Sequence, residues 1–313
     1  MKPKVTVVVT VKNALATIKK CIDSILANDF PKEVVVVDAF STDGTYEELK
    51  KFGRKIKLVQ LKGSAPVGFN CGLSHATAPV VALTDSDCVV DSRWLTCLTK
   101  AIKNGYVAAA GSCWTPESER GLARAIGEAF DERYDINQRE VLRAPTMNLA
   151  FRTDIGRTVM FDESMPIAFE TDFCFRLLKH GKIAYVKGAK VYHHHRAGWK
   201  DFFKQQMEYG KYGAIVYLKH PSRMGGDHIS KKRFFTQVAL AYILVAAAFG
   251  SIFLSGLAPL ALLSLAGILG LFAYEIAKLR PRNPLLFTAM LATRLAAWLI
   301  GGVEGLMVTF LGN

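Results

Sequence analysis

Up to about residue 115, short runs of β-branched residues alternate with segments whose apolar residues recur at helical spacing. After the first run, Leu15, Ile18, Ile22 and Leu26 fall on one face of a predicted helix. Continuous apolar strands separated by amphipathic helices predict an α/β domain with a parallel sheet covered on both faces. The predicted strands cover residues 5–11, 33–38, 56–61, 80–85 and 107–112.

The pattern changes after Arg233, where 41 residues pass without a charge before Glu275. As a helix rising about 1.5 Å per residue, this stretch would reach roughly 60 Å, or two bilayer crossings. Gly256 and Pro259 permit a reversal near its middle. We therefore predict a membrane hairpin with spans at about 235–254 and 258–277, because a buried soluble helical core would need polar faces that this stretch lacks.

A third apolar segment, 285–311, is interrupted by Arg294 and Glu304. We interpret it as a third span, with a tilted or re-entrant helix as the rival interpretation. Charges inside a span usually face a partner helix, a cavity or a headgroup. The two residues therefore suit pairing between protomers of a homo-oligomer, contact with a lipid phosphate, or a helix that does not cross.

The formal charge of +13 is concentrated before Phe234, because the remaining residues hold four basic and two acidic side chains and the first 233 carry +11. Basic residues flank both ends of the predicted hairpin, and the positive-inside rule then places both ends in the cytoplasm. We predict a cytoplasmic domain of residues 1–220 and a cell-membrane region of residues 221–313. The six cysteines form no CxxC pair and fit a reducing compartment. The basic, aromatic segment 199–220 is typical of a helix on a membrane surface.

Polar residues follow three of the predicted strands. Asn13 follows the first, Asp38 ends the second, and Asp85 and Asp87 end the fourth. Ligands of such sheets bind beyond the carboxyl ends of the strands. Two carboxylates at i and i+2 can hold one hard divalent cation and leave positions for substrate phosphates. Asp is also common in turns and helix caps, so the pair alone is a weak signal.

Five blocks in order, VVVTVKNA, VVVVDAFSTDGT, GFNCGLSHA with ALTDSD, TMNLAFR and FETDFCFRL, resemble the family 2 glycosyltransferases with a GT-A fold. The resemblance covers about residues 4–215. It implies a Rossmann-like nucleotide-diphospho-sugar transferase domain, followed here by an all-α transmembrane region. It also implies transfer of a sugar from a nucleotide-diphosphate donor with inversion, using Mg²⁺ or Mn²⁺. Members with C-terminal membrane helices often use polyprenyl phosphates or lipid-linked glycans as acceptors.

The resemblance also assigns the donor site. Asp38 falls where the family contacts the uracil or guanine base. Asp85 and Asp87 match the DxD pair, in which the second carboxylate binds the metal and the first contacts the ribose or sugar. The remaining donor positions lie in the loop after the first strand, in GFNCGLSHA and in TMNLAFR: Thr10, Val11, Asn13, Asn70 and Asn148.

The catalytic base of the family lies in an acidic motif that FETDFCFRL resembles. Aligning Asp172 and Arg176 with that motif puts Glu170 at the base position, and Phe169 stands where an acid is customary. Glu170 and Asp172 are thus the predicted catalytic residues. If the acceptor is already an ionised phosphate, Glu170 mainly positions it. The alternative is that both carboxylates only offset the dipole of the following helix.

Three consecutive histidines follow a later predicted strand. Residues 193 and 195 share one face of a strand. The family often has a histidine here near the metal and diphosphate, so His193 or His195 is a candidate additional ligand. A surface or hydrogen-bonding role is the alternative for the run.

Together these observations predict a membrane-anchored glycosyltransferase that acts on a lipid-linked acceptor. The Gln-x-x-Arg-Trp motif of processive members is not present, which argues against a polysaccharide synthase. The alternative function is a non-catalytic nucleotide-sugar-binding subunit that scaffolds a partner enzyme. Nucleic-acid binding is disfavoured, since no zinc-finger, RRM or helix-turn-helix pattern occurs.

Overall fold

The computed structural model describes residues 2–28 and 30–311 of the chain. It divides the chain into two compact units. The first comprises residues 1–116 and 134–194, and the second comprises residues 117–133 and 195–313. Helix α8 therefore belongs to the same unit as the C-terminal apolar helices.

The first unit is built on a nine-stranded sheet. Eight strands follow the order β3-β2-β1-β4-β8-β6-β9-β5, and the ninth, β7, pairs with β9 outside this order. Its strands are β1 Val5–Val11, β2 Lys32–Asp38, β3 Lys57–Gln60, β4 Val80–Leu83, β5 Cys88–Val90, β6 Ala108–Trp114, β7 Glu140–Val141, β8 Leu149–Arg152 and β9 Ile183–His193. Its α-helices are α1 Ile18–Leu26, α2 Thr45–Lys50, α3 Ala65–His75, α4 Trp94–Lys103, α6 Thr153–Val159 and α7 Phe169–Leu177, and its 3₁₀ turns are η1 Gly53–Lys55 and η2 Thr146–Asn148.

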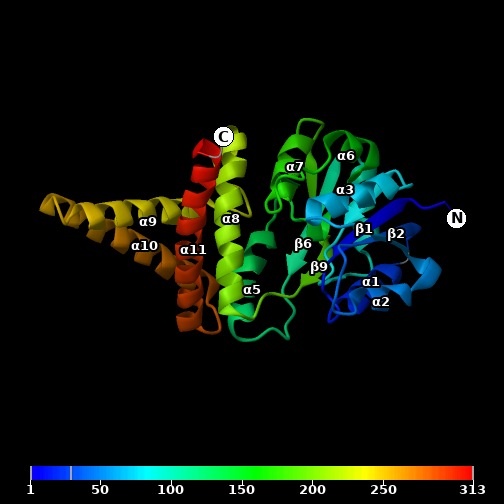
Figure 1. Cartoon of the computed structure of the whole chain (residues 1–313), viewed down its shortest axis with the longest axis horizontal. Coiled ribbons are helices and arrows are strands. Elements are labelled where there is room, and N and C mark those ends of the chain that lie inside the picture. The colour runs from blue at the N-terminus through cyan, green and yellow to red at the C-terminus, as the bar shows by residue number, and fades with distance from the viewer. Residues whose placement is uncertain (1, 29, 312–313) are drawn as a thin grey trace. The chain divides into compact units, whose positions relative to one another are not determined.

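The first four strands pair in parallel, as their alternation with helices predicts. Helices α1 and α2 lie on one face of this half of the sheet and α3 and α6 lie on the other (Figure 1). The core contains the uninterrupted valines of β1 and β2, which are almost fully buried. The α/β class predicted from the sequence is confirmed.

The sheet is not wholly parallel. Strand β8 runs antiparallel to both β4 and β6, and β5 runs antiparallel to β9. Strand β8 follows the short turn η2 rather than a crossover helix, so the chain enters the sheet from the end at which β4 finishes. The short strand β5 was not predicted, because three residues carry no periodicity.

The second unit is helical. Its helices are α5 Gly121–Tyr134, whose last residue falls in the first unit, α8 Trp199–Lys219, α9 Lys232–Gly250, α10 Ala258–Leu279 and α11 Pro284–Leu311, with the 3₁₀ turns η3 Pro221–Arg223 and η4 Ser255–Leu257. Helices α9 and α10 lie side by side as a hairpin that turns at η4 (Figure 1). Segments 232–250, 255–279 and 284–311 are long and apolar enough to cross a membrane. Helices with the length and apolar composition of membrane spans are therefore present at the three predicted places.

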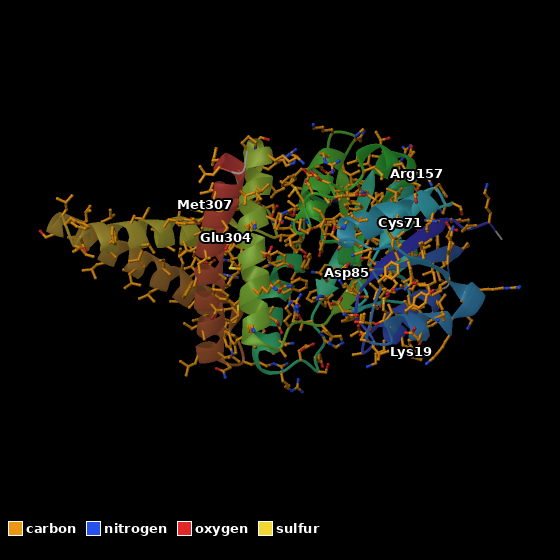
Figure 2. The ribbon with its side chains drawn as sticks, viewed as in Figure 1. Lys19, Cys71, Asp85, Arg157, Glu304 and Met307 are labelled. Atoms are coloured by element: carbon orange, nitrogen blue, oxygen red, sulfur yellow. The ribbon has the colours of Figure 1, made fainter. Side chains whose placement is uncertain are left out.

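The two charged residues of the third apolar segment find partners inside this unit. Arg294 lies 3.7 Å from a carboxylate oxygen of Glu275 on α10. Glu304, labelled in Figure 2, lies 4.0 Å from the Lys211 ammonium on α8. Each of the two residues thus has an opposite charge within 4.0 Å in the same chain, so neither requires a second protomer.

Helices α8 and α11 pack closely because glycines line their contact. A Cβ atom on Gly301 would lie 1.9 Å from the Met207 carbonyl oxygen, and one on Gly305 would lie 2.3 Å from that of Lys211. No side chain fits in these positions. Small residues let two helix backbones approach in this way when apolar burial supplies little driving force.

We expect Gly301→Ala to lower the free energy of unfolding by about 1–3 kcal/mol, because the added methyl overpacks the α8–α11 contact. Chemical denaturation of the full chain in detergent measures the loss. Gly270→Ala is the matched control, since a Cβ there meets no atom within 4 Å. Equal stability of the two variants would contradict the packing argument.

Candidate functional site

The parallel register brings the ends of β1, β2 and β4 together. Val11 lies opposite Asp38, and Val8 lies opposite Leu83 at the end of β4. Asp85 follows two residues after Leu83 (labelled in Figure 2). The polar residues after these strands therefore share one edge of the sheet, as the sequence predicts.

The carboxylates of Asp85 and Asp87 lie in the turn between β4 and β5. The hydroxyl of Thr146 donates to Asp85 Oδ1 at 3.0 Å. His193 Nε2 lies 3.4 Å from Asp87 Oδ2. The second contact has a simple origin, since β5 pairs with β9 and sets Cys88 opposite His193.

The pKa values of the two carboxyl groups are shifted in opposite directions. Burial, and then the charge of Asp87, raise the pKa of Asp85 to about 7, while His193 and the Thr146 hydroxyl act against the rise. Burial also raises the pKa of Asp87, but the hydrogen bond and charge of His193 outweigh it and lower that pKa. Two neighbouring carboxylates that resist joint ionisation form a favourable place for added positive charge.

The possible ligand atoms at this site suit a hard divalent cation that takes further ligands from its substrate. Asp85 and Asp87 offer carboxylate oxygens, and His193 stands beside Asp87. Within residues 2–28 and 30–311, no group of three or more His, Cys, Asp or Glu side chains forms a metal cage. A cation held there would need further ligands besides these side chains.

Glu170 lies in the first turn of α7. Ala168, just before this helix, has a left-handed backbone with φ of 60°, an uncommon conformation for a residue with a side chain. This turn directs the chain into α7. Burial raises the pKa of Glu170, opposed by a backbone hydrogen bond and by the charge of Arg143. The charge of Glu170 also contributes, as the smallest of five causes, to the raised pKa of Asp85.

Asp172 has a different setting from Glu170. Its side chain is fully buried and accepts a hydrogen bond from Arg176 Nε at 2.7 Å. Arg176 in turn donates to the carbonyls of Val159 and Met160 at the end of α6. Asp172 thus joins α7 to α6, and Glu170 is the member of the predicted catalytic pair that interacts with Asp85.

The predicted base-contacting residue, Asp38, is fully buried at the end of β2. Its carboxylate accepts hydrogen bonds from the Ser41 backbone N–H at 3.2 Å and from Gln60 Nε2 at 3.0 Å. Asn13 Oδ1 accepts from the Thr42 N–H at 2.8 Å. These bonds fix the loop after β2 against the loop after β1.

The remaining predicted positions, for the donor and for the second histidine ligand, lie in several elements. Val11 is buried in β1, and Thr10 beside it faces α3, where a Cβ on Gly68 would lie 2.8 Å from Thr10 Cγ2. The side-chain amide of Asn70 exchanges hydrogen bonds with the backbone of Phe161, at 2.8 and 2.9 Å. His195 belongs to the second unit, where its ring packs edge-on against Phe130 at 4.8 Å between centroids.

Asn148 is fully buried and joins the turn η2 to β6, β9 and α4. Its Nδ2 donates to the carbonyls of Ser112 and Ala189, both at 2.8 Å, and its Oδ1 accepts from Trp94 Nε1 at 2.9 Å. The pairing of β6 with β9 is irregular between Gly111 and Ser112, which leaves those carbonyls available to the amide.

Thr146, at the start of the same 3₁₀ turn, is the site residue that sequence reasoning missed. It lies two residues before Asn148 in the TMNLAFR block. Because Asn148 anchors the turn, Thr146 is held against the Asp85 carboxylate. The block itself was the available signal, but only the turn shows which of its side chains reaches the site.

We expect Asn148→Ala to destabilise the protein by about 2–4 kcal/mol, because the substitution leaves buried hydrogen-bonding groups of Trp94, Ser112 and Ala189 without a partner. The midpoint of thermal unfolding checks this loss. The exposed Asn137 supplies the control substitution. A midpoint equal to that of Asn137→Ala would contradict the anchoring role.

Comparison with known proteins shows the family of the chain. The family model described as "Glycosyl transferase family 2" matches residues 6–163, about half of the chain. This chain belongs to the family 2 glycosyltransferases. The match covers the strand ends that carry Asn13, Asp38, Asp85 and Asp87.

Curated relatives of this glycosyltransferase include the pre-mycofactocin glycosyltransferase of Mycobacterium tuberculosis, 31% identical over 49% of this chain and 35% of that protein. Another is the GalNAc(5)-diNAcBac-PP-undecaprenol beta-1,3-glucosyltransferase of Campylobacter jejuni, 31% identical over 45% of this chain and 48% of that protein. The matched part of this glycosyltransferase thus spans between a third and a half of these relatives.

A solved structure extends the likeness to the fold of the whole chain. The mannosyltransferase PcManGT from Pyrobaculum calidifontis, solved in complex with GDP-Man and Mn²⁺, has a TM-score of 0.61 and 18% sequence identity. The comparison covers 98% of this glycosyltransferase and 88% of the mannosyltransferase. The chain therefore has the GT-A fold followed by C-terminal helices.

Proposed function

We propose that this glycosyltransferase moves a sugar, with inversion, from a nucleotide-diphosphate donor to a lipid-linked acceptor such as a polyprenyl phosphate or a lipid-linked glycan. The observation that carries the proposal is the position of the Asp85 and Asp87 carboxylates just beyond the end of β4, at the sheet edge where β1 and β2 also end. The three apolar helices support a membrane acceptor. One relative of this chain is named for an undecaprenol-linked substrate.

Asp85 and Asp87 are proposed to hold a divalent cation, Mg²⁺ or Mn²⁺. When bound, the cation supplies positive charge that stabilises the diphosphate leaving group. Thr146 orients Asp85 by its hydroxyl, and His193 keeps Asp87 ionised. A solved relative of the same fold contains Mn²⁺ and GDP-mannose.

Glu170 is proposed to be the general base. Its carboxylate takes the proton of the acceptor hydroxyl while that oxygen forms a bond to the anomeric carbon. The bond from this carbon to the diphosphate breaks on the opposite face, and the leaving group keeps the electron pair. Burial, which raises the pKa of Glu170, makes it a stronger base than an exposed glutamate.

The catalytic unit is proposed to face the cytoplasm, where nucleotide sugars are made. Basic residues at both ends of the apolar hairpin support this orientation by the positive-inside rule. In intact cells, a thiol reagent that cannot cross the membrane should leave the half-buried Cys71 unmodified. Modification in intact cells as rapid as in lysed cells would contradict the orientation.

A donor panel tests the proposed activity. The detergent-solubilised full chain is heated with UDP or GDP in the presence of Mn²⁺ or Mg²⁺, with ADP as a comparison and EDTA as the metal-free control. We expect one nucleotide to raise the unfolding midpoint only with metal, because selective binding to the folded state stabilises it. Labelled sugars of that nucleotide are then offered to membranes that contain the protein.

Label recovered in the lipid fraction supports the transferase. The competing function, a nucleotide-sugar-binding subunit that scaffolds another enzyme, predicts metal-dependent binding without transfer of label. If neither nucleotide binds and no label moves, the proposed donor site is wrong.

A further inference from the structure

The second unit contains a cluster of charged side chains that the transfer reaction does not use. Glu132 on α5 lies 2.7 Å from the Lys231 ammonium and 2.8 Å from that of Lys278, and it is also hydrogen-bonded to Arg233. Although burial raises the pKa of Glu132, hydrogen bonds from these three cations lower it to about 2. The cluster therefore joins α5 to the start of α9 and the end of α10.

A second carboxylate, Glu275, extends the cluster into the apolar helices. Gln237 donates to its Oε1 at 2.9 Å, Arg233 lies 3.3 Å from the same oxygen, and Arg294 lies 3.7 Å from its Oε2. Arg294 is only 7% exposed. Within the described part of the chain, its Nε has no hydrogen-bond partner. A buried guanidinium donor without an acceptor is costly, and its pairing with one carboxylate is incomplete.

A cavity of about 80 Å³ opens beside these groups, entirely within the second unit. Four cationic residues line it, Arg133, Lys231, Arg233 and Arg294, against the two carboxylates of Glu132 and Glu275. The wall therefore carries an excess of two positive charges. The volume admits a few water molecules or one small polar group.

Aromatic side chains form another part of the wall. Trp298 donates from Nε1 to Gln206 at 3.2 Å, and Phe234 packs edge-on against Trp298. The Arg294 guanidinium lies 5.0 Å from the centre of the Phe234 ring. Aromatic residues beside cations are typical of the headgroup level of a membrane, and the cavity lies where α9 begins and α10 ends, against the middle of α11.

We propose that this cavity binds a phosphate group, carried by a membrane lipid headgroup or free in solution. The charge excess and the Arg294 Nε without an acceptor both call for an anion with several oxygens. Arginine matches phosphate geometry better than other cations, and basic pockets between membrane helices on the cytoplasmic side bind anionic headgroups. This site is separate from the donor residues, so the proposal does not depend on the transferase activity.

Binding to the detergent-solubilised full chain tests the site with two probes, dioctanoyl phosphatidic acid and inorganic phosphate, and dioctanoyl glycerol as the uncharged comparison. We expect phosphatidic acid to raise the unfolding midpoint and dioctanoyl glycerol to leave it unchanged. An equal response to inorganic phosphate assigns the site to the phosphate group alone. A response to phosphatidic acid only assigns it to a lipid. No response to either phosphate probe overturns the proposal.

Variants locate the response in the cavity. Arg294→Gln is expected to raise the apparent Kd of the responding probe at least about tenfold, the loss typical of one charge-assisted hydrogen bond. Arg133→Gln serves as a second variant if Arg294→Gln fails to fold, because Arg133 is half-buried at the cavity wall. Arg282→Gln, at an exposed position close to the end of α10, should leave the Kd unchanged. Equal affinity in all three variants also overturns the proposal.

Discussion

Replacing Glu170 with glutamine is expected to lower the rate of sugar transfer by about 10²–10⁴, the usual contribution of a general base. The substitution keeps the size of the side chain but removes the carboxylate that takes the acceptor proton. Donor binding should be unchanged, because the proposed metal ligands Asp85 and Asp87 are intact. Initial rates with a labelled donor, together with nucleotide affinity measured on the same preparation, check both parts.

The control for this prediction is Glu47→Gln on α2, an exposed position that is not among the proposed site residues. A rate loss below about tenfold in Glu170→Gln would contradict the base assignment. It would instead favour an acceptor that arrives as an ionised phosphate, or a glutamate that only offsets the dipole of α7. A parallel loss of nucleotide binding would point to a disturbed fold.

Asp87→Asn is expected to weaken metal-dependent nucleotide binding by about 100-fold. The estimate follows from a loss of roughly 3 kcal/mol of electrostatic stabilisation at a divalent site. The variant also removes the charge that His193 faces at 3.4 Å. Titration of the nucleotide in the presence of Mn²⁺ measures the change, and the wild-type chain in EDTA should behave like the variant.

Asp23→Asn is the matched control, because the exposed Asp23 forms an ion pair with Lys19, and such a surface pair contributes little to stability. If Asp87→Asn binds the nucleotide as tightly as this control, the aspartate pair does not hold a metal for the donor. The raised pKa of Asp85 would then reflect only burial beside Asp87.

The fold could be predicted well from local patterns. Apolar runs at the spacing of buried strands gave the four parallel strands, and the uncharged stretch before Glu275 gave the α9–α10 hairpin. Both follow from the free energy of moving apolar surface out of water, which each residue contributes whatever its partners. Strand direction at β8 was not predictable in this way, because it depends on where the chain enters the sheet.

The candidate site was also predictable only in part. Sequence motifs pointed to Asp85, Asp87 and Glu170, but the contacts of these residues depend on neighbours far away in the chain. Thr146 reaches Asp85 across 61 residues, and the β5–β9 pairing sets His193 beside Asp87. Asn70 and Asn148 instead bond to buried backbone groups, which a motif cannot reveal.

By itself, then, the sequence determined where the chain is apolar, where its strands end and which chemical groups follow those ends. The tertiary structure decided which of these groups interact and which are occupied by structural contacts. It also paired Arg294 with Glu275 and left four cations around one cavity. The physical reason is that burial is a property of each segment, whereas charge interactions and hydrogen bonds act over a few ångströms and exist only after distant segments meet.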